Sequence, residues 1–199
     1  MYYSSHGFGS KKELVDCVKS LYATGLTTSV SGNQSIRSGD TMWITPSRMP
    51  SYKIRPADLV KVDLKTSKVA GKIKPSIELD MHRSIYNARP DINAIVHTHS
   101  PFTIGVSISA RFRHVIEEAK LVIGESAVIA NKPSDSPELA KAVSDEFQRG
   151  SKIVVIKNHG VVAGDSDIES ARALVESLEE WAKILTVAQL FGGASDWLD

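Results

Sequence analysis

The segment from Ala94 to Pro101 constrains this chain most, because an apolar run ends there in two histidines, His97 and His99. In a β-strand, residues i and i+2 point to the same face, so the two imidazoles are expected to lie side by side. Two such nitrogens are ready ligands for a divalent transition metal, most often zinc. A catalytic zinc takes about three protein ligands and keeps one position open. The sequence therefore has to supply a third ligand.

His159 is the best candidate for that third ligand. It closely follows the β-branched run 153–156 and directly precedes Gly160, which permits an unusual backbone conformation at the end of a strand. The alternative is a structural histidine that caps a loop. A histidine pair on one strand together with a third histidine at a strand end favours a metal site.

Glu78 is the best candidate for an acid/base group. We expect a helix that is opened by Lys74-Pro75-Ser76 and ended by Pro90, with Glu78 in its first turn, where the exposed amides suit an anion. A carboxylate beside a metal can be a ligand in the resting state and a general base when substrate is present. The alternative is an ordinary helix-start glutamate. His82, four residues later, is expected to pack behind the site.

Size and charge exclude several classes of protein. The 199 residues fit one domain, 1–199, with 1–10 expected to be flexible. The formal net charge is +1 and no long run of one sign occurs, which argues against nucleic-acid and membrane-surface binding. No apolar stretch reaches the roughly 18 residues that span a bilayer. The N-terminus lacks the pattern of a signal peptide, and the single cysteine, Cys17, excludes an internal disulfide, so we expect a cytoplasmic protein.

Helical and strand-like segments interleave without a strict βαβ rhythm, which predicts an α/β fold with a mixed sheet covered on both faces by helices. Helices are expected at 14–22, 77–86, 101–110, 137–149 and 168–191. Strands are expected at 29–37, 41–45, 59–64, 92–97, 121–130, 153–156 and 161–164.

Five short motifs occur in one order along the chain. They are Ser31-Gly32-Asn33, Ile44-Thr45-Pro46-Ser47, Lys74-Pro75-Ser76-x-Glu78, His97-x-His99-Ser100-Pro101 and Asn158-His159-Gly160. Together they resemble the class II aldolase/adducin family, in particular its members that act on fuculose-1-phosphate. The resemblance runs from about Lys12 to Gly192, and a glutamate common in the family's late helix has its counterpart in Glu179.

The resemblance implies a single three-layer α/β/α domain with a largely antiparallel central sheet, and a homotetramer with active sites at subunit interfaces. It implies a Zn²⁺ ion, or another divalent ion such as Mn²⁺, Co²⁺ or Fe²⁺, held by His97, His99 and His159. Glu78 becomes the acid/base and also a fourth ligand in the resting state. The phosphate of a small sugar substrate would be held by Gly32, Asn33, Thr45, Ser47 and Ser76. Such small donor residues suit phosphate, although turn chemistry also favours them.

Two residues depart from the family's pattern in this phosphate site. Arg48 stands where the family often has a glycine, and Ile77 replaces the second serine of Pro-Ser-Ser-Glu. Arg48 could supply a bidentate donor to the phosphate, or it could point to solvent.

A second acid/base group is expected near residue 118. Fuculose-phosphate aldolases place a tyrosine near this point, whereas this chain reads Ile116-Glu117-Glu118-Ala119. Other family members carry a glutamate here. Glu118 is therefore the candidate and Glu117 its competitor, with plain surface charge as the alternative.

The favoured hypothesis is reversible aldol cleavage of a small phosphorylated ketose through a metal-stabilised enediolate, with Glu78 and Glu118 moving protons. A sugar-phosphate dehydratase or decarboxylase on the same metal site is the nearest alternative. A non-catalytic, adducin-like interaction module is the alternative from another class, and three convergent histidines count against it.

Overall fold

The computed structural model describes residues 9–109, 117 and 126–193. Within them, one mixed sheet has the strand order β4-β3-β2-β1-β5-β8-β7-β6. Every neighbouring pair is antiparallel except β6 and β7, which are parallel. The strands are β1 (Asn33–Ser38), β2 (Thr41–Ile44), β3 (Val60–Asp63), β4 (Val69–Ala70), β5 (Ala94–Thr98), β6 (Ala127–Ile129), β7 (Ile153–Ile156) and β8 (Gly160–Asp165). The predicted α/β fold with a largely antiparallel mixed sheet is confirmed.

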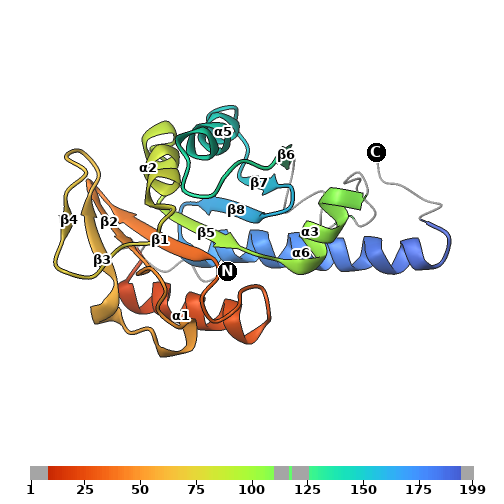
Figure 1. Ribbon diagram of the computed structural model, residues 1–199, viewed down its shortest axis with the longest axis horizontal. Helices are drawn as coiled ribbons and strands as arrows, with labels where there is room; N and C mark the ends of the chain where they lie inside the picture. Colours follow the sequence, from red (N-terminus) through yellow and green to blue (C-terminus); the bar gives the residue numbers. More distant parts are fainter. Residues whose placement is uncertain (1–8, 110–116, 118–125, 194–199) are drawn as a thin grey trace.

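Helices cover both faces of this sheet and complete a three-layer α/β/α arrangement (Figure 1). The helices are α1 (Lys11–Ala23), α2 (Leu79–Ala88), α3 (Pro101–Ser109), α5 (Pro137–Gln148) and α6 (Ile168–Leu190), with short 3-10 turns η1 (Ser51–Lys53) and η2 (Pro56–Asp58). Helices α1 and α6 lie on one face, and α2 and α5 lie on the other. No helix in the described ranges is long and apolar enough to cross a membrane.

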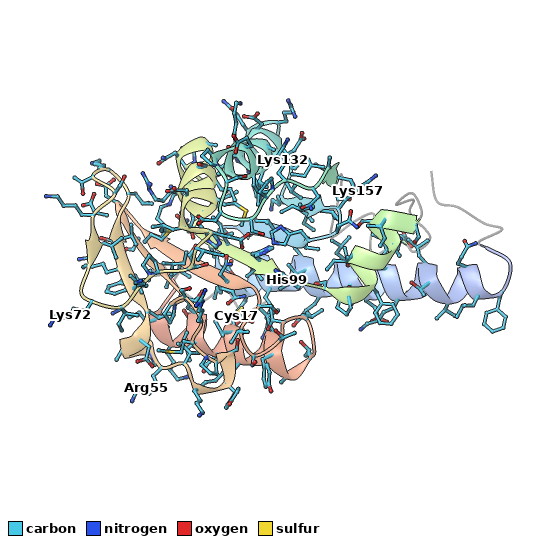
Figure 2. The ribbon with its side chains drawn as sticks, in the orientation of Figure 1. Cys17, Arg55, Lys72, His99, Lys132 and Lys157 are labelled. Carbon is cyan, nitrogen blue, oxygen red and sulfur yellow. The ribbon has the colours of Figure 1, made fainter. Side chains whose placement is uncertain are left out.

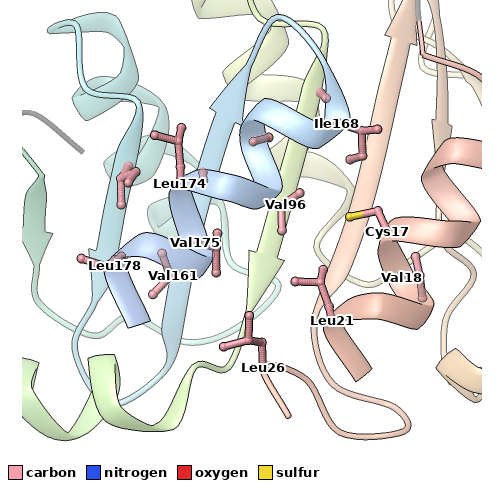
Figure 3. Close-up of a cluster of buried hydrophobic side chains, with 14 of the residues drawn as sticks. Cys17, Val18, Leu21, Leu26, Val96, Val161, Ile168, Leu174, Val175 and Leu178 are labelled. Atoms are coloured by element: carbon pink, nitrogen blue, oxygen red, sulfur yellow. The ribbon is translucent and has the colours of Figure 1, made fainter. Parts of the chain in front are cut away.

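Two hydrophobic cores form because strand side chains alternate between the faces. On β5, Ala94 and Val96 join the core under α1 and α6, which Figure 3 shows in close-up. Ile95 joins the other core, under α2 and α5. By the same alternation His97 points toward the α2 and α5 face, so the first histidine of the pair lies inside a packed layer.

The start of α2 differs from the expected one. The helix begins at Leu79 and Glu78 is its N-cap residue, so the prediction that Pro75 opens this helix is wrong. Pro75 instead forms an isolated β-bridge with Pro46. The Ser76 amide donates to the Thr45 carbonyl at 3.0 Å, and this extended pairing holds residues 74–76 out of the helix.

Other boundaries agree with the expected ones to within a few residues, with two exceptions. Strand β4 was not expected, because two residues leave no periodic signal. Of the strand expected at 121–130, residues 127–129 form β6, whereas 121–125 lie outside the described residues. Residues 1–8, where we expected flexibility, also lie outside them, and Ser10 is the N-cap of α1 in a capping box with Glu13.

A buried carboxylate joins α6 to the start of α3. Glu179 is 1% exposed, and it accepts hydrogen bonds from the Phe102 amide at 3.0 Å and from the Thr103 amide and hydroxyl at 2.9 and 2.8 Å. These amides belong to the first turn of α3 and have no partner inside the helix. Because α3 follows His99 directly, Glu179 also fixes the segment that leaves the histidine pair.

We predict that Glu179→Ala lowers the free energy of unfolding by about 3 kcal/mol, since it removes charged hydrogen bonds from buried amides. The matched control is Glu180→Ala on the same helix, where an exposed ion pair with Lys183 is worth less than about 1 kcal/mol. Urea unfolding of both variants makes the comparison. Equal losses would contradict the capping role.

Candidate metal centre and pocket

Three histidines converge where β5 ends and β8 begins. His97 lies in β5, His99 follows that strand, and His159 precedes Gly160 at the start of β8. The two strands pair directly, with His97 opposite Val162. One ligand atom from each ring lies within 4.8 Å of the others, and Figure 2 shows His99 near the end of β5. The structure thus brings together the three predicted ligands.

The orientation of His97 follows from one hydrogen bond. Its Nδ1 lies 2.9 Å from the Val161 carbonyl oxygen, which can only accept, so Nδ1 carries the proton. In the neutral ring, Nε2 therefore presents a lone pair to the cluster. This Nε2 is buried and has no hydrogen-bond partner among the described residues.

Glu78 faces the cluster from the N-terminus of α2. Its Oε2 lies 3.1 Å from His97 Nε2, and its Oε1 lies 3.4 Å from His159 Nε2. Glu78 Oε1, like His97 Nε2, is buried without a hydrogen-bond partner in the described structure. Acceptors that converge with no donor between them suit a cation, and three imidazoles plus a carboxylate suit a divalent transition metal.

The electrostatics of the cluster favour two neutral histidines, His99 and His159, beside an ionised glutamate. Burial alone raises the pKa of Glu78, but His97, Asn33 and His159 outweigh it and hold that pKa well below its usual range. Burial, together with the charge of His97 and His159, lowers the pKa of His99 to about 4. Burial and His97 also lower the pKa of His159. His99 and His159 are therefore unprotonated at neutral pH, which is the form that binds metals.

His97 is the exception among the three. Burial lowers its pKa, but the adjacent Glu78 carboxylate and the Val161 carbonyl raise it by more, so the net shift is upward. A proton at His97 Nε2 occupies the place where a metal would bind.

Gly160 allows the histidines to approach one another. A Cβ at this position would lie 2.2 Å from the Thr98 carbonyl oxygen and 3.1 and 3.2 Å from the rings of His97 and His99. Any other residue would therefore push β5 and β8 apart at the cluster.

The cluster opens into a pocket of about 290 Å³ that the six residues predicted to bind substrate also line: Gly32, Asn33, Thr45, Ser47, Arg48 and Ser76. The Pro46–Pro75 bridge brings the second and third motifs together on this wall. Sequence reasoning missed Ser134, which lines the pocket from the loop before α5. Residues 134–136 read Ser-Asp-Ser, a common loop sequence that does not single out Ser134.

Arg48 and Ile77, the two departures from the family's pattern, both line the pocket. Arg48 has a φ of 59°, in the left-handed region that favours glycine, which explains why the family often has a glycine there. Ile77 is 56% exposed and gives the pocket an apolar edge beside Glu78. Glu118 lies outside the described residues, whereas Glu117 is helical and exposed.

Comparisons with solved structures place this fold among the class II aldolases. The L-fuculose-1-phosphate aldolase from Thermus thermophilus superposes with a TM-score of 0.80 at 28% identity, over 93% of this chain and 96% of that one.

The family model described as Class II Aldolase and Adducin N-terminal domain matches residues 12–186, and the chain belongs to this family. The L-fuculose phosphate aldolase of Methanococcus maripaludis is 34% identical over 173 residues, which are 86% of this chain and 93% of that protein. The 5-methylthioribulose-1-phosphate/5-deoxyribulose-1-phosphate aldolase of Escherichia coli is 34% identical over 175 residues, covering 87% and 81%. The resemblance read from the five motifs is confirmed.

We predict that Gly160→Ala weakens Zn²⁺ binding at least about tenfold, because the added methyl group displaces the strands that orient two histidines. Calorimetric titration of Zn²⁺ into metal-free protein measures the effect. Gly105→Ala is the control, since a Cβ there meets nothing within 4 Å. Circular dichroism establishes that both variants are folded, and unchanged affinity in folded Gly160→Ala would contradict the prediction.

Proposed function

We propose that this protein is a metal-dependent aldolase that reversibly cleaves a small phosphorylated ketose. The observation that carries the proposal is the joining of the histidine–carboxylate cluster to a pocket lined by small hydrogen-bond donors. The names of relatives support the substrate class, since both fuculose-phosphate and deoxyribulose-phosphate aldolases match most of the chain.

The metal is proposed to be Zn²⁺ or a similar divalent ion, held by His97, His99 and His159 with Glu78 as an additional ligand in the resting state. When bound, it supplies Lewis-acid polarisation of the substrate carbonyl. The unpartnered Nε2 of His97 and Oε1 of Glu78 support this assignment. The protein's part is to keep His99 and His159 neutral and to pre-orient the three rings.

Glu78 is proposed to move the proton at the carbon that leaves or joins the aldehyde fragment. Its carboxylate is 5% exposed, so little water competes for that proton. It lines the same pocket as His99, His159 and the predicted phosphate donors. Glu118 is proposed as the second acid/base group, with Glu117 as its competitor, and substitution of each by glutamine separates them.

The phosphate is proposed to bind at the hydroxyl residues that line the pocket. Thr45, Ser47 and Ser76 offer hydroxyl donors, and Arg48 offers a bidentate charged donor. Ser134 adds a further hydroxyl from the loop before α5. A sugar phosphate would thus contact both these residues and Glu78.

We predict that the metal-loaded protein cleaves at least one member of a panel of ketose 1-phosphates, and that Glu78→Gln lowers kcat by about a hundredfold or more. Aldehyde release in a coupled assay measures the rate, and metal content is measured in parallel. Asp80→Asn, two residues on and exposed, is the control and should retain activity.

Two results would sink the aldolase assignment. Loss of water or CO₂ from related substrates, with no cleavage of any panel member, would identify a dehydratase or a decarboxylase. A purified protein that binds no divalent metal and cleaves nothing would point to an interaction module.

Arg48 gives a second prediction, because it combines an unfavourable backbone conformation with a proposed role in binding. Arg48→Gly should raise KM for the phosphorylated substrate about tenfold and stabilise the protein by about 1 kcal/mol, since glycine adopts a positive φ without penalty. Arg48→Ala should raise KM equally with no gain in stability. Lys74→Ala, a neighbouring exposed cation outside the pocket lining, is the control. Unchanged KM in both Arg48 variants would mean that this side chain points to solvent.

We also propose a cytoplasmic homotetramer with active sites at subunit interfaces. Large apolar side chains exposed on α3 and along the end of α6 support an assembly: Phe102, Ile108, Val187 and Leu190. Analytical ultracentrifugation gives the oligomeric state directly.

A further inference from the structure

A buried chain of hydrogen bonds leads from the interior to the proposed catalytic carboxylate. Asn33 Nδ2 donates to Glu78 Oε2 at 2.8 Å. The other end of this amide, Oδ1, lies 2.6 Å from His82 Nε2. His82 Nδ1 lies 2.7 Å from the Ser35 hydroxyl, which lies 2.8 Å from the hydroxyl of Tyr86. Ser35 and His82 are 0% exposed and Tyr86 is 1% exposed.

The direction of these hydrogen bonds is set at the Glu78 end. A carboxylate only accepts, so Asn33 must turn its N–H group toward Glu78 and its carbonyl toward His82. His82 Nε2 must then carry a proton and donate it. In a neutral ring Nδ1 is consequently an acceptor, so the Ser35 hydroxyl donates to it and the Tyr86 hydroxyl donates to Ser35.

The other tautomer of His82 is incompatible with the hydrogen bond between Asn33 and Glu78. If His82 carried its proton on Nδ1, Nε2 would be an acceptor and Asn33 would have to rotate its N–H group toward it. The Asn33 carbonyl would then face the Glu78 carboxylate, two acceptors with no proton between them. A charged His82 is also disfavoured, because burial, aided by the charge of His97, lowers the pKa of His82 to about 3.

We propose that His82, supported by Ser35 and Tyr86, is a positioning residue that fixes the Asn33 amide so that it donates to Glu78 and holds this carboxylate at the histidine cluster. The inference rests on the proposed function in taking Glu78 as the acid/base group. It assigns Asn33 a part in aiming Glu78 besides the phosphate contact expected for it. His82 itself is neither a member of the histidine cluster nor a lining residue of the pocket, and it reaches the pocket only through Asn33.

Nitrogen NMR of the zinc-loaded protein, labelled with ¹⁵N-histidine, tests the direction of the chain without any substrate. The signal that is lost in His82→Gln identifies His82. We expect the neutral Nε2–H form across the neutral pH range. An Nδ1–H form or an imidazolium would overturn the proposal, whatever reaction the enzyme catalyses.

Kinetics of three variants test the consequence for Glu78. His82→Leu should lower kcat by at least about tenfold with little change in KM and full metal content, since outer partners of a site typically contribute this much. His82→Gln should recover most of kcat, because its amide can donate to Asn33 and accept from Ser35. Ile85→Val, a fully buried change on the same helix, controls for loss of packing and should leave kcat unchanged.

The positioning role of His82 and the proposed function can be contradicted by different results. If His82→Leu and His82→Gln lose kcat equally, or if Ile85→Val loses as much, His82 is only structural and the positioning role is wrong. If the wild-type protein cleaves no ketose phosphate, the proposed function fails, while the NMR result still decides the direction of the hydrogen-bond chain.

Discussion

The hydrogen bond from His97 Nδ1 to the Val161 carbonyl is the contact on which the rest of the site depends. It joins the two central strands β5 and β8 and fixes the ring so that Nε2 faces the other histidines. The strands are antiparallel, so His99, just after β5, and His159, just before β8, lie at the same end of the strand pair. Because Gly160 lets the strands approach without a side chain between them, the sheet itself sets the geometry of the cluster.

Strand β1 supplies buried polar side chains that contact the residues of the site. Its residues Asn33, Gln34 and Ser35 are polar and yet buried, which is unusual for a central strand. Each has a partner: Asn33 bonds Glu78, Gln34 donates to the His97 carbonyl oxygen at 3.1 Å, and Ser35 contacts His82. The weak alternation of this strand in the sequence is therefore explained by its role, since apolar side chains there would leave the acceptors of the site unmatched.

The sequence predicted most of the fold and the members of the histidine cluster, because strand periodicity and the His-x-His spacing act over short distances. It misplaced the start of α2, since Pro75 usually opens a helix and the pairing with Pro46 leaves no pattern to detect. Ser134 was missed for the same reason: its position depends on how the loop before α5 folds over the pocket. The role inferred for His82 required the direction of hydrogen bonds, which spacing does not contain.

The order of the elements has one further consequence. Between His99 and His159 the chain passes through α3, β6, α5 and β7 before it returns to the middle of the sheet. A cation bound by both histidines would therefore close a long loop and act as a cross-link, in the manner of a disulfide. If the metal binds only to the native state, the resistance of the protein to heat and denaturants would depend on the free metal concentration. A cation proposed for catalysis would thus also hold β5 and β8 together.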